Sequence, residues 1–347
     1  MRPRQRMLAL VAAVALTVPM LGACGASGGT TTAGKQGCAA YEGETISLVV
    51  PFSPGGGYDS YARMIAPELA KRLKSKVIVE NQDGAGGLLA INSLATEKPD
   101  GKRLAIMNAV GAGGAAIAGA PGAEFGLDNL SYIGRVGASF HIFSTSAKSR
   151  FKSFEDVRAA NDFRYGSTGP GAADFVNGQM LKAIFKLKAK IITGFEGSEE
   201  NELALTSGKV DGMTGDFDSR LPAIRNGDHR PLLLLGPKRD PQIPNTPALL
   251  ELDLTPQQRA LARSTVDLLS FGRPIVGPPG IPKDRLTCLR TTLQSVLQDK
   301  AFTAKAAKTG RPINWMSGAD VDRLVQRLLN SPPEFRSIMK NAYAGEN

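Results

Sequence analysis

Glycines and small polar residues gather at three corners of the chain, where they could bind a ligand through the backbone. The corners are residues 51–59 (PFSPGGGYD), 108–114 (NAVGAGG) and 166–171 (GSTGPG), and each follows an apolar run and precedes a helical pattern. In open α/β sheets, ligands collect at the carboxyl ends of strands. A helix start there offers free N–H groups and a positive dipole end, which suit an anion. Together the corners predict an anion-binding site, while each one alone also fits an ordinary turn.

Asp59, at the end of the first corner, has two interpretations. As the N-cap of the following helix, it would accept a hydrogen bond from a nearby backbone N–H. As a ligand contact, it would favour an amine or a water molecule over a carboxylate. Both roles are compatible.

Motifs for enzyme chemistry are incomplete. Residues 84–90 (GAGGLLA) fit G-x-G-x-x-A after a strand, but Met107 and Asn108 stand where a dinucleotide fold needs an acid. A phosphate loop and a nucleophile elbow are both absent from the sequence. A hydrolase that uses Ser167 would need a positioned base, and a lysine is the alternative to the two histidines. We therefore expect no cofactor, no catalytic residue and no enzyme activity.

The two histidines of the chain are His141 and His229. His141 lies in an apolar run, which predicts a buried structural role. His229 lies in the polar segment NGDHRP, which predicts a turn. Neither has a cysteine or carboxylate at metal-ligand spacing, so we expect no metal site.

Residues 1–24 have the pattern of a secretory signal, with three early arginines and an apolar stretch that ends before Pro19. This stretch is too short to predict a membrane span. Residues 21–24 (LGAC) resemble the bacterial lipobox, whose cysteine is acylated. We predict a signal peptide over 1–23, lipidation at Cys24 and a flexible tether over 24–44. A plain signal peptide with an incidental cysteine is the alternative.

Two further cysteines, Cys38 and Cys288, form an even pair in a chain that we expect to be exported. An oxidising compartment favours a disulfide between them. This bond would tie the end of the tether to a helix over residues 286–297. Alternatively they are unrelated thiols, with Cys288 a small buried apolar residue.

The chain has 347 residues, which suggests two domains, and its formal net charge is +10. The positive charge is spread along the chain without the basic, aromatic-rich runs that nucleic-acid binding needs. We expect no nucleic-acid partner. A diffuse positive field either attracts anions or only keeps the protein in solution.

From Thr45 onward, short apolar runs alternate with helical patterns, which predicts a parallel α/β architecture. The predicted strands cover residues 46–52, 76–81, 103–108, 140–145, 162–167, 189–195, 210–214, 231–236 and 273–278. The predicted helices cover residues 60–73, 174–187, 199–206, 282–297, 319–329 and 333–343, and a capping box at Ser153–Asp156 opens a short one.

The run 50–63 (VPFSPGGGYDSYAR) strongly resembles the start of the Bug/TctC family, the extracytoplasmic solute-binding receptors of tripartite tricarboxylate transporters. The resemblance covers about residues 45–345. It continues through 79–81 (VEN), 84–87 (GAGG), 99–101 (PDG), 165–171 (YGSTGPG), Gly197, 208–211 (GKVD), 221–232, 244–249 and 276–283 (VGPPGIPK).

The resemblance implies an α/β, two-lobed periplasmic-binding-protein fold, a clamshell with two interlobe crossovers. The crossovers are expected near Ser139–Ser146 and Asp267–Arg273. Lobe 1 would then combine residues 45–140 and 272–347, and lobe 2 would cover 146–266. Such receptors hold the ligand between the lobes and present the shut form to membrane subunits.

The family's ligand contacts can be carried over position by position as expectations. In lobe 1 they are Phe52, Ser53, Gly55, Gly56 and Asp59. In lobe 2 they are Ser167, Thr168, Gly169 and Gly171, with Phe195 and Asp216 as a further wall.

The second lobe departs from the family pattern. Ala172 and Asp174 stand where a serine and a histidine are common, and residues 193–197 (TGFEG) lack the usual tyrosine and lysine. Asp174, Glu196 and Asp216 make this lobe acidic. If one of them faces the ligand, an amino acid or another ligand with a cationic end is favoured over a bare tricarboxylate. Alternatively, they are helix-cap and loop charges.

The resemblance implies a receptor for a small carboxylate-type ligand, a di- or tricarboxylate or an amino acid. Its partners would be integral membrane permease subunits. The lipid anchor would hold it at the outer face of the bacterial cytoplasmic membrane; otherwise the protein would be periplasmic. We expect a monomer. The alternative is a ligand-sensing or scaffold lipoprotein without a transport role, and neighbouring permease genes would distinguish the two.

Overall fold

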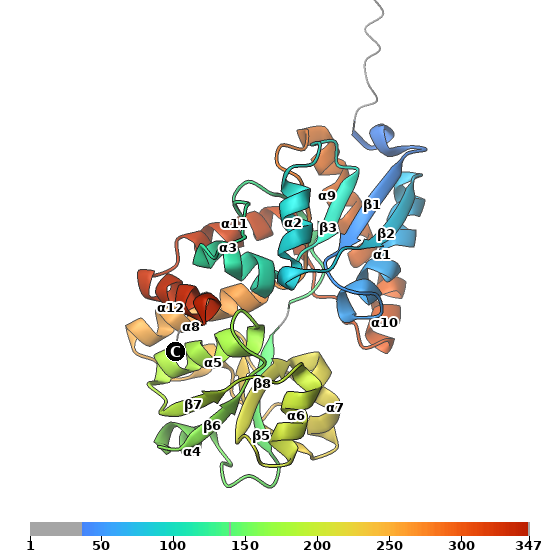
Figure 1. Cartoon of the computed structure of the whole chain (residues 1–347). Helices are drawn as coiled ribbons and strands as arrows, with labels where there is room; N and C mark the ends of the chain where they lie inside the picture. The colour runs from blue at the N-terminus through green and yellow to red at the C-terminus, as the bar shows by residue number, and fades with distance from the viewer. Residues whose placement is uncertain (1–36, 139, 346–347) are drawn as a thin grey trace, which may run out of the picture. The chain divides into compact units, whose positions relative to one another are not determined.

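The computed structural model describes residues 37–138 and 140–345, and these residues belong to one compact unit. The predicted signal peptide, Cys24 and most of the predicted tether lie outside the described residues. Within the described ranges, every helix is too short or too polar to cross a membrane. The described strands form two sheets, called here sheet A and sheet B (Figure 1).

Sheet A has the strand order β11-β4-β10-β3-β1-β2. Its strands are β1 (Thr45–Val50), β2 (Lys76–Asn81), β3 (Arg103–Ile106), β4 (Ser131–Arg135), β10 (Pro274–Gly277) and β11 (Met316–Ser317). β1 pairs in parallel with β2 and β3, so that Leu48 lies beside Val79 and Leu104. Leu48 is fully buried, as expected for a continuous apolar strand inside a sheet that is covered on both faces.

The helices that come after strands of sheet A along the chain are α1 (Gly57–Leu73), α2 (Leu88–Ala95), α3 (Gly114–Ala118), α9 (Lys283–Leu297), α10 (Lys300–Lys308) and α11 (Gly318–Leu329). The helix predicted over residues 60–73 is confirmed as α1, and one of its faces is buried through Tyr61, Ile65, Leu69 and Leu73. A spacing of four residues places these side chains on one side of the helix, where they contact the sheet. Burial of this face fixes α1 and therefore the loop that precedes it.

Sheet B has the strand order β7-β6-β8-β5-β9. Its strands are β5 (His141–Ser146), β6 (Phe163–Gly166), β7 (Ala189–Ile192), β8 (Gly212–Asp216) and β9 (His229–Leu235). The accompanying helices are α4 (Phe154–Ala159), α5 (Ala173–Phe185), α6 (Ser198–Thr206) and α7 (Phe217–Arg225). The predicted capping box of α4 is confirmed, because the Ser153 hydroxyl accepts from the Asp156 N–H and Asp156 accepts from the Ser153 N–H.

Both sheets are mixed, so the prediction of a parallel architecture was only partly correct. β10 runs antiparallel to β3 and β4, and β5 runs antiparallel to β8 and β9. These are the strands with which the chain enters each sheet from the other one. The alternation of strands and helices in the sequence does not encode the direction of such a strand.

The two segments that connect the sheets lie side by side. The Val136 N–H donates to the Arg273 carbonyl at 3.0 Å, and the Arg273 N–H donates to the Gly137 carbonyl at 2.9 Å. The lobe limits expected above stay a prediction, although the change of sheet between β4 and β5, and between β9 and β10, is compatible with them.

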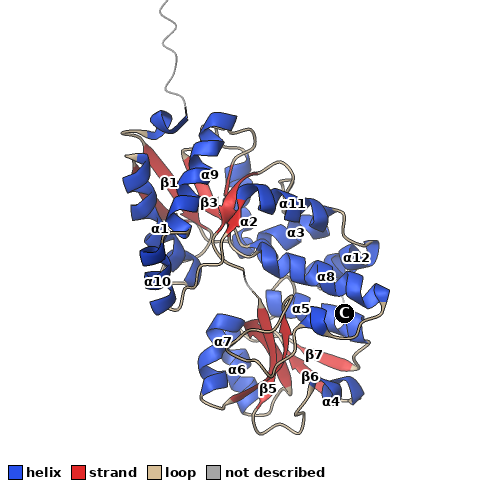
Figure 2. Cartoon of the chain, turned by 180° about the vertical axis from the view of Figure 1, so that it is seen from behind, coloured by secondary structure: helices blue, strands red, loops and turns tan. Residues whose placement is uncertain are grey.

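Two further helices, α8 (Pro256–Phe271) and α12 (Pro333–Ala344), connect the regions around the two sheets. α8 packs against α5 and α11, and α12 packs against α3 and α5 (Figure 2). One cluster of buried side chains accordingly contains Met107 beside sheet A and Phe163 in sheet B.

Cys38 and Cys288, 250 positions apart in sequence, form a disulfide with 5.3 Å between their Cα atoms. The bond links the 3-10 helix η1 (Gly37–Tyr41) to α9. The Gly37 N–H also donates to Asp284 at 2.6 Å, and Tyr41 is fully buried. Together these contacts fix the first described residues against sheet A. The remaining short helical turns are η2 (Ala85–Gly87), η3 (Ala109–Gly113) and η4 (Leu249–Glu251).

Candidate ligand-binding site

The predicted first-lobe residues lie in the loop between β1 and α1 and in the first turn of α1, and this region is bonded to the loops after β2 and β3. The Ser53 hydroxyl donates to Asp83 at 2.7 Å. The Tyr58 hydroxyl donates to Asn108 Oδ1 at 3.2 Å, and Asn108 Nδ2 donates to the Gly86 carbonyl at 3.4 Å. Because β3, β1 and β2 are parallel neighbours, their carboxyl ends meet at one edge of the sheet. Two of the glycine corners therefore lie together.

Asp59 is not the N-cap of α1, so that interpretation was wrong; Gly56 occupies the N-cap position. Asp59 lies in the first turn and is only 4% exposed. Its carboxylate accepts from the Gly55 N–H at 3.0 Å, from Arg63 Nε at 2.8 Å and from Asn81 Nδ2 at 3.0 Å. The hydrogen bond from Arg63 lowers the pKa of Asp59 to about 2. Asp59 therefore anchors the loop from within.

The predicted second-lobe residues lie between β6 and α5, and Asp174 organises them. Its carboxylate accepts from the Thr168 N–H at 2.8 Å, from the Thr168 hydroxyl at 2.9 Å and from the Ser167 hydroxyl at 3.3 Å. It also accepts from the Phe175 N–H at 2.8 Å. Both Ser167 and Asp174 are buried. One of the acids that could have faced the ligand is thus engaged inside the loop.

A buried network of polar side chains lies next to this loop and is bonded to it. The Tyr165 hydroxyl donates to the Asp174 carbonyl at 2.7 Å and lies 2.7 Å from the Thr214 hydroxyl. His141 Nδ1 lies 2.9 Å from Asn177 Nδ2. Burial lowers the pKa of His141, so the ring stays neutral near pH 7. The structural role predicted for His141 is confirmed.

The expected wall residues differ in their environments. Phe195 is half-buried and packs against a small cluster that includes Leu205 and Met213. Glu196 is exposed. Asp216 ends β8, and its Oδ2 lies 2.9 Å from Arg273 Nη2. The charge of Asp216 is thus compensated within the protein.

Arg273 was not predicted as a site residue, although it connects the two predicted halves. Its side chain is 12% exposed and donates to the Ala138 carbonyl at 2.9 Å as well as to Asp216. The guanidinium carbon lies 5.4 Å from the ring centre of Tyr58, which itself packs 4.8 Å from Phe52. A continuous series of contacts therefore runs from the first loop to Asp216. In the sequence, the only sign of this connecting role is a single arginine before Pro274.

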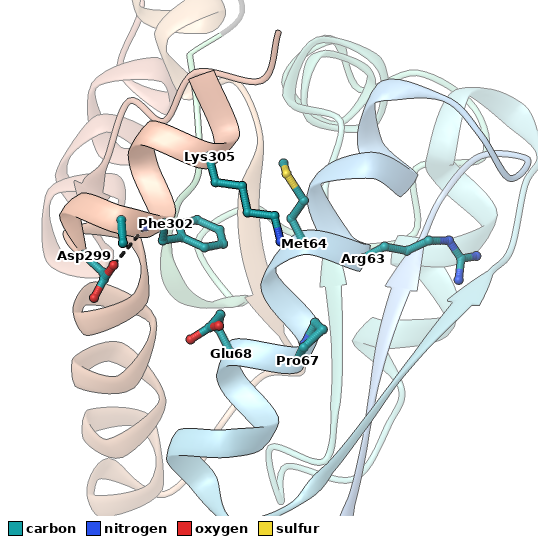
Figure 3. A pocket seen from close by; sticks show the side chains of 8 residues that line it. Arg63, Met64, Pro67, Glu68, Asp299, Phe302 and Lys305 are labelled. Atoms are coloured by element: carbon teal, nitrogen blue, oxygen red, sulfur yellow. Dashed lines mark hydrogen bonds between the residues drawn. The ribbon is translucent and has the colours of Figure 1, made fainter. Parts of the chain in front are cut away.

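A separate pocket of about 320 Å³ lies between α1 and α10 (Figure 3). Its lining consists of Arg63, Met64, Pro67, Glu68, Asp299, Ala301, Phe302 and Lys305, which are different residues from those predicted to bind ligand. Glu68 pairs with Arg72, and Asp299 caps α10 by accepting from the Phe302 N–H at 2.9 Å. In Figure 3 the Arg63 side chain extends away from the other lining residues. The charges of Glu68 and Asp299 in this pocket therefore stabilise α1 and α10.

Metal chemistry has no support in the described ranges, where no group of three histidine, cysteine or acidic side chains could hold an ion. His229 does not lie in a turn as predicted. It begins β9, is buried, and its Nε2 lies 3.4 Å from Glu202. The polar segment NGDH predicted a turn because the sequence does not show that Glu202 of α6 lies beside the His229 ring.

The sequence model of the TctC family, described as the tripartite tricarboxylate transporter family receptor, matches residues 61–336. The chain belongs to this family. Among curated relatives, the protein BugT of Bordetella pertussis is 26% identical over 280 residues, which are 79% of this chain and 82% of BugT. The resemblance inferred from the glycine-rich motifs is therefore confirmed.

Solved structures of similar proteins confirm the predicted fold class. A TctC solute-binding protein from Polaromonas has a TM-score of 0.71 at 19% identity, covering 86% of this receptor and 98% of that chain. MatC from Rhodopseudomonas palustris, with bound malate, has a TM-score of 0.63 at 22% identity and coverages of 85% and 99%. An R. palustris protein with adipate has a TM-score of 0.63 at 20% identity and coverages of 86% and 97%. The receptor shares the fold of these proteins. Its membership of the TctC receptor family makes it a binding protein, not an enzyme.

Proposed function

We propose that this receptor captures a small dicarboxylate-type metabolite with the loops after β1 and β6, for uptake by a tripartite transporter. The observation that carries the proposal is that Asp59 and Asp174, one acid in each loop, are held by internal hydrogen bonds. The glycine backbone at the starts of α1 and α5 is then the part of each loop that meets the ligand. Helix starts favour anions.

The charge distribution supports an anionic ligand over one with a cationic end. Asp174 is bonded within its loop, and Asp216 is paired with Arg273. Of the three acids that made lobe 2 acidic, Glu196 is the exposed one. An amino acid would need a carboxylate for its ammonium group, and neither Asp59 nor Asp174 is free of internal hydrogen bonds to supply it. The bound malate and adipate of the similar structures agree with a dicarboxylate.

The proposed location is extracytoplasmic, with lipidation at Cys24 holding a monomeric receptor near its permease subunits. The signal-like pattern of residues 1–24 and the lipobox-like LGAC support this location. The Cys38–Cys288 disulfide agrees with an oxidising compartment. Mass spectrometry of the membrane fraction would detect a diacylglyceryl group on Cys24.

Thermal unfolding of the protein without residues 1–24 tests ligand capture against a panel of di- and tricarboxylates and of acidic and neutral amino acids. A ligand at about 100 times its Kd stabilises by about 2.7 kcal/mol, which is a few degrees for a protein of this size. We expect a shift with a dicarboxylate. A flat panel from folded, ligand-free protein would contradict the proposal.

A matched pair of variants locates the bound molecule. Gly55 and Gly43 both have positive φ, +92° and +80°, and a Cβ at either would meet nothing within 4 Å. Their substitution by alanine should therefore cost similar stability. Only Gly55→Ala should weaken binding, because its methyl group would project into the predicted ligand space. Equal binding by both variants would place the ligand elsewhere.

A further inference from the structure

The last turn of α12 is bonded to two of the three glycine-rich loops. The Ala342 carbonyl accepts from the Gly171 N–H at 3.0 Å. The Tyr343 hydroxyl donates to the Val110 carbonyl and lies 3.3 Å from the Gly111 carbonyl. Gly171 belongs to the loop after β6 in sheet B, and Val110 and Gly111 belong to the loop after β3 in sheet A. Neighbouring residues of one helix therefore hold loops of both sheets.

The packing around Tyr343 leaves little freedom. A Cβ on Gly114 would lie 2.2 Å from the Tyr343 hydroxyl oxygen, so the hydroxyl fits only because position 114 has no side chain. On the other side, a Cβ on Gly171 would lie 3.5 Å from the Tyr343 ring. Both views show α12 between α3 and α5, the helices that follow these two loops (Figures 1 and 2). Burial raises the pKa of Tyr343 further above its ordinary value, so its hydroxyl stays protonated and can donate well beyond neutral pH.

We propose that Tyr343 is a positioning residue that couples the loop after β3 to the loop after β6 through the end of α12. The two loops can separate only if α12 loses its hydrogen bonds to at least one of them. Under the proposed function, on which this second step rests, the same coupling sets how readily the two ligand loops come together. The coupling itself concerns only this chain and is testable without a ligand.

Hydrogen–deuterium exchange of the Tyr343→Phe variant tests the coupling, because the substitution removes the hydroxyl and keeps the ring. Tyr132→Phe is the control, since the Tyr132 hydroxyl is also buried and donates to a backbone carbonyl, that of Leu127, at 2.8 Å. Loss of one hydrogen bond should raise local exchange about fivefold. We expect this rise in both segments 107–115 and 166–174 for Tyr343→Phe and in neither for Tyr132→Phe.

Unchanged exchange in both segments, or a rise in segment 107–115 alone, would overturn the proposal, because Tyr343 would then hold at most one loop. Gly114→Ala gives a second route, since its methyl group displaces the same hydroxyl and should produce the same pattern. Malate is the probe for the ligand step, with a weaker affinity expected for Tyr343→Phe than for Tyr132→Phe. If malate and the rest of the panel fail to bind, the proposed function fails while the exchange result still decides the coupling.

Discussion

Arg273 and Asp216 form an ion pair of 2.9 Å between residues that lie 57 positions apart, one just before β10 and the other at the end of β8. The pair joins the segment that returns to sheet A with a strand of sheet B. Asp216 also precedes α7, where a negative charge interacts favourably with the helix dipole. Because both side chains are mostly buried, their charges depend on each other more than exposed charges do.

Asp216→Asn should lower the free energy of unfolding by about 2 to 4 kcal/mol, because it leaves the Arg273 charge without its partner. Urea unfolding measures this loss. Arg150→Gln is the control, since the Arg150–Asp162 pair is 65% and 69% exposed and should contribute less than about 1 kcal/mol. Equal small losses would mean that water compensates Arg273. The double variant Asp216→Asn with Arg273→Gln should recover part of the loss.

The disulfide between Cys38 and Cys288 should contribute about 3 to 5 kcal/mol, because it closes a long loop in the unfolded chain. A reductant should lower the Tm of the unmodified protein. The double variant Cys38→Ser with Cys288→Ala should have the lower Tm from the start and should not respond to reductant. A response in the double variant would show that the reductant acts on something other than this bond.

Gly272 lies where the two connecting segments meet, with φ +59° and ψ −113°. A Cβ there would lie 2.2 Å from the Gly137 carbonyl oxygen. Gly272→Ala should therefore cost about 3 kcal/mol or more, since it combines backbone strain with a clash. Gly310 has φ +68° and open space around it, so Gly310→Ala should cost only about 1 kcal/mol. Similar losses in urea unfolding would mean that the connecting segments separate easily.

Local patterns predicted most of the elements that position the site. The loops around Gly55 and Gly169 were recognisable because an apolar run, a glycine cluster and a helical pattern follow one another within a few residues. α8 was missed, although Thr255, Pro256 and Gln258 give a readable start; in the structure Thr255 and Gln258 form a capping box there. The short strand β4 was missed because five residues that include Gly134 carry little signal.

The interactions that decide charge at the site could not be predicted in this way. Asp216 and Asp174 look like equal acidic candidates in the sequence, but one is paired with Arg273 and the other is bonded within its own loop. The pairing with Arg273 depends on strand order, which brings distant segments together. Asp174 follows Thr168 by six residues, yet the fold of the loop decides that its carboxylate turns inward.

Asp59 gives a stability contribution that depends on pH. Its folded pKa is lowered from 3.8 to about 2, chiefly by the hydrogen bond from Arg63. A depressed carboxyl pKa stabilises the fold above the unfolded value and loses this effect as the pH falls through the folded value. Asp59→Asn should therefore be less stable by about 1 to 2 kcal/mol at pH 6, through loss of charged hydrogen bonds.

The difference between Asp59→Asn and the unmodified protein should begin to shrink near pH 4, and most of it should be lost by pH 2, close to the folded pKa of Asp59. Urea unfolding over this pH range measures it. Asp83→Asn is the control, because Asp83 is exposed and bonds only the Ser53 hydroxyl among its described contacts. A gap that stays constant down to pH 2 would mean that Asp59 acts through packing. The loop that carries Gly55 would then be held by shape and not by the charge of Asp59.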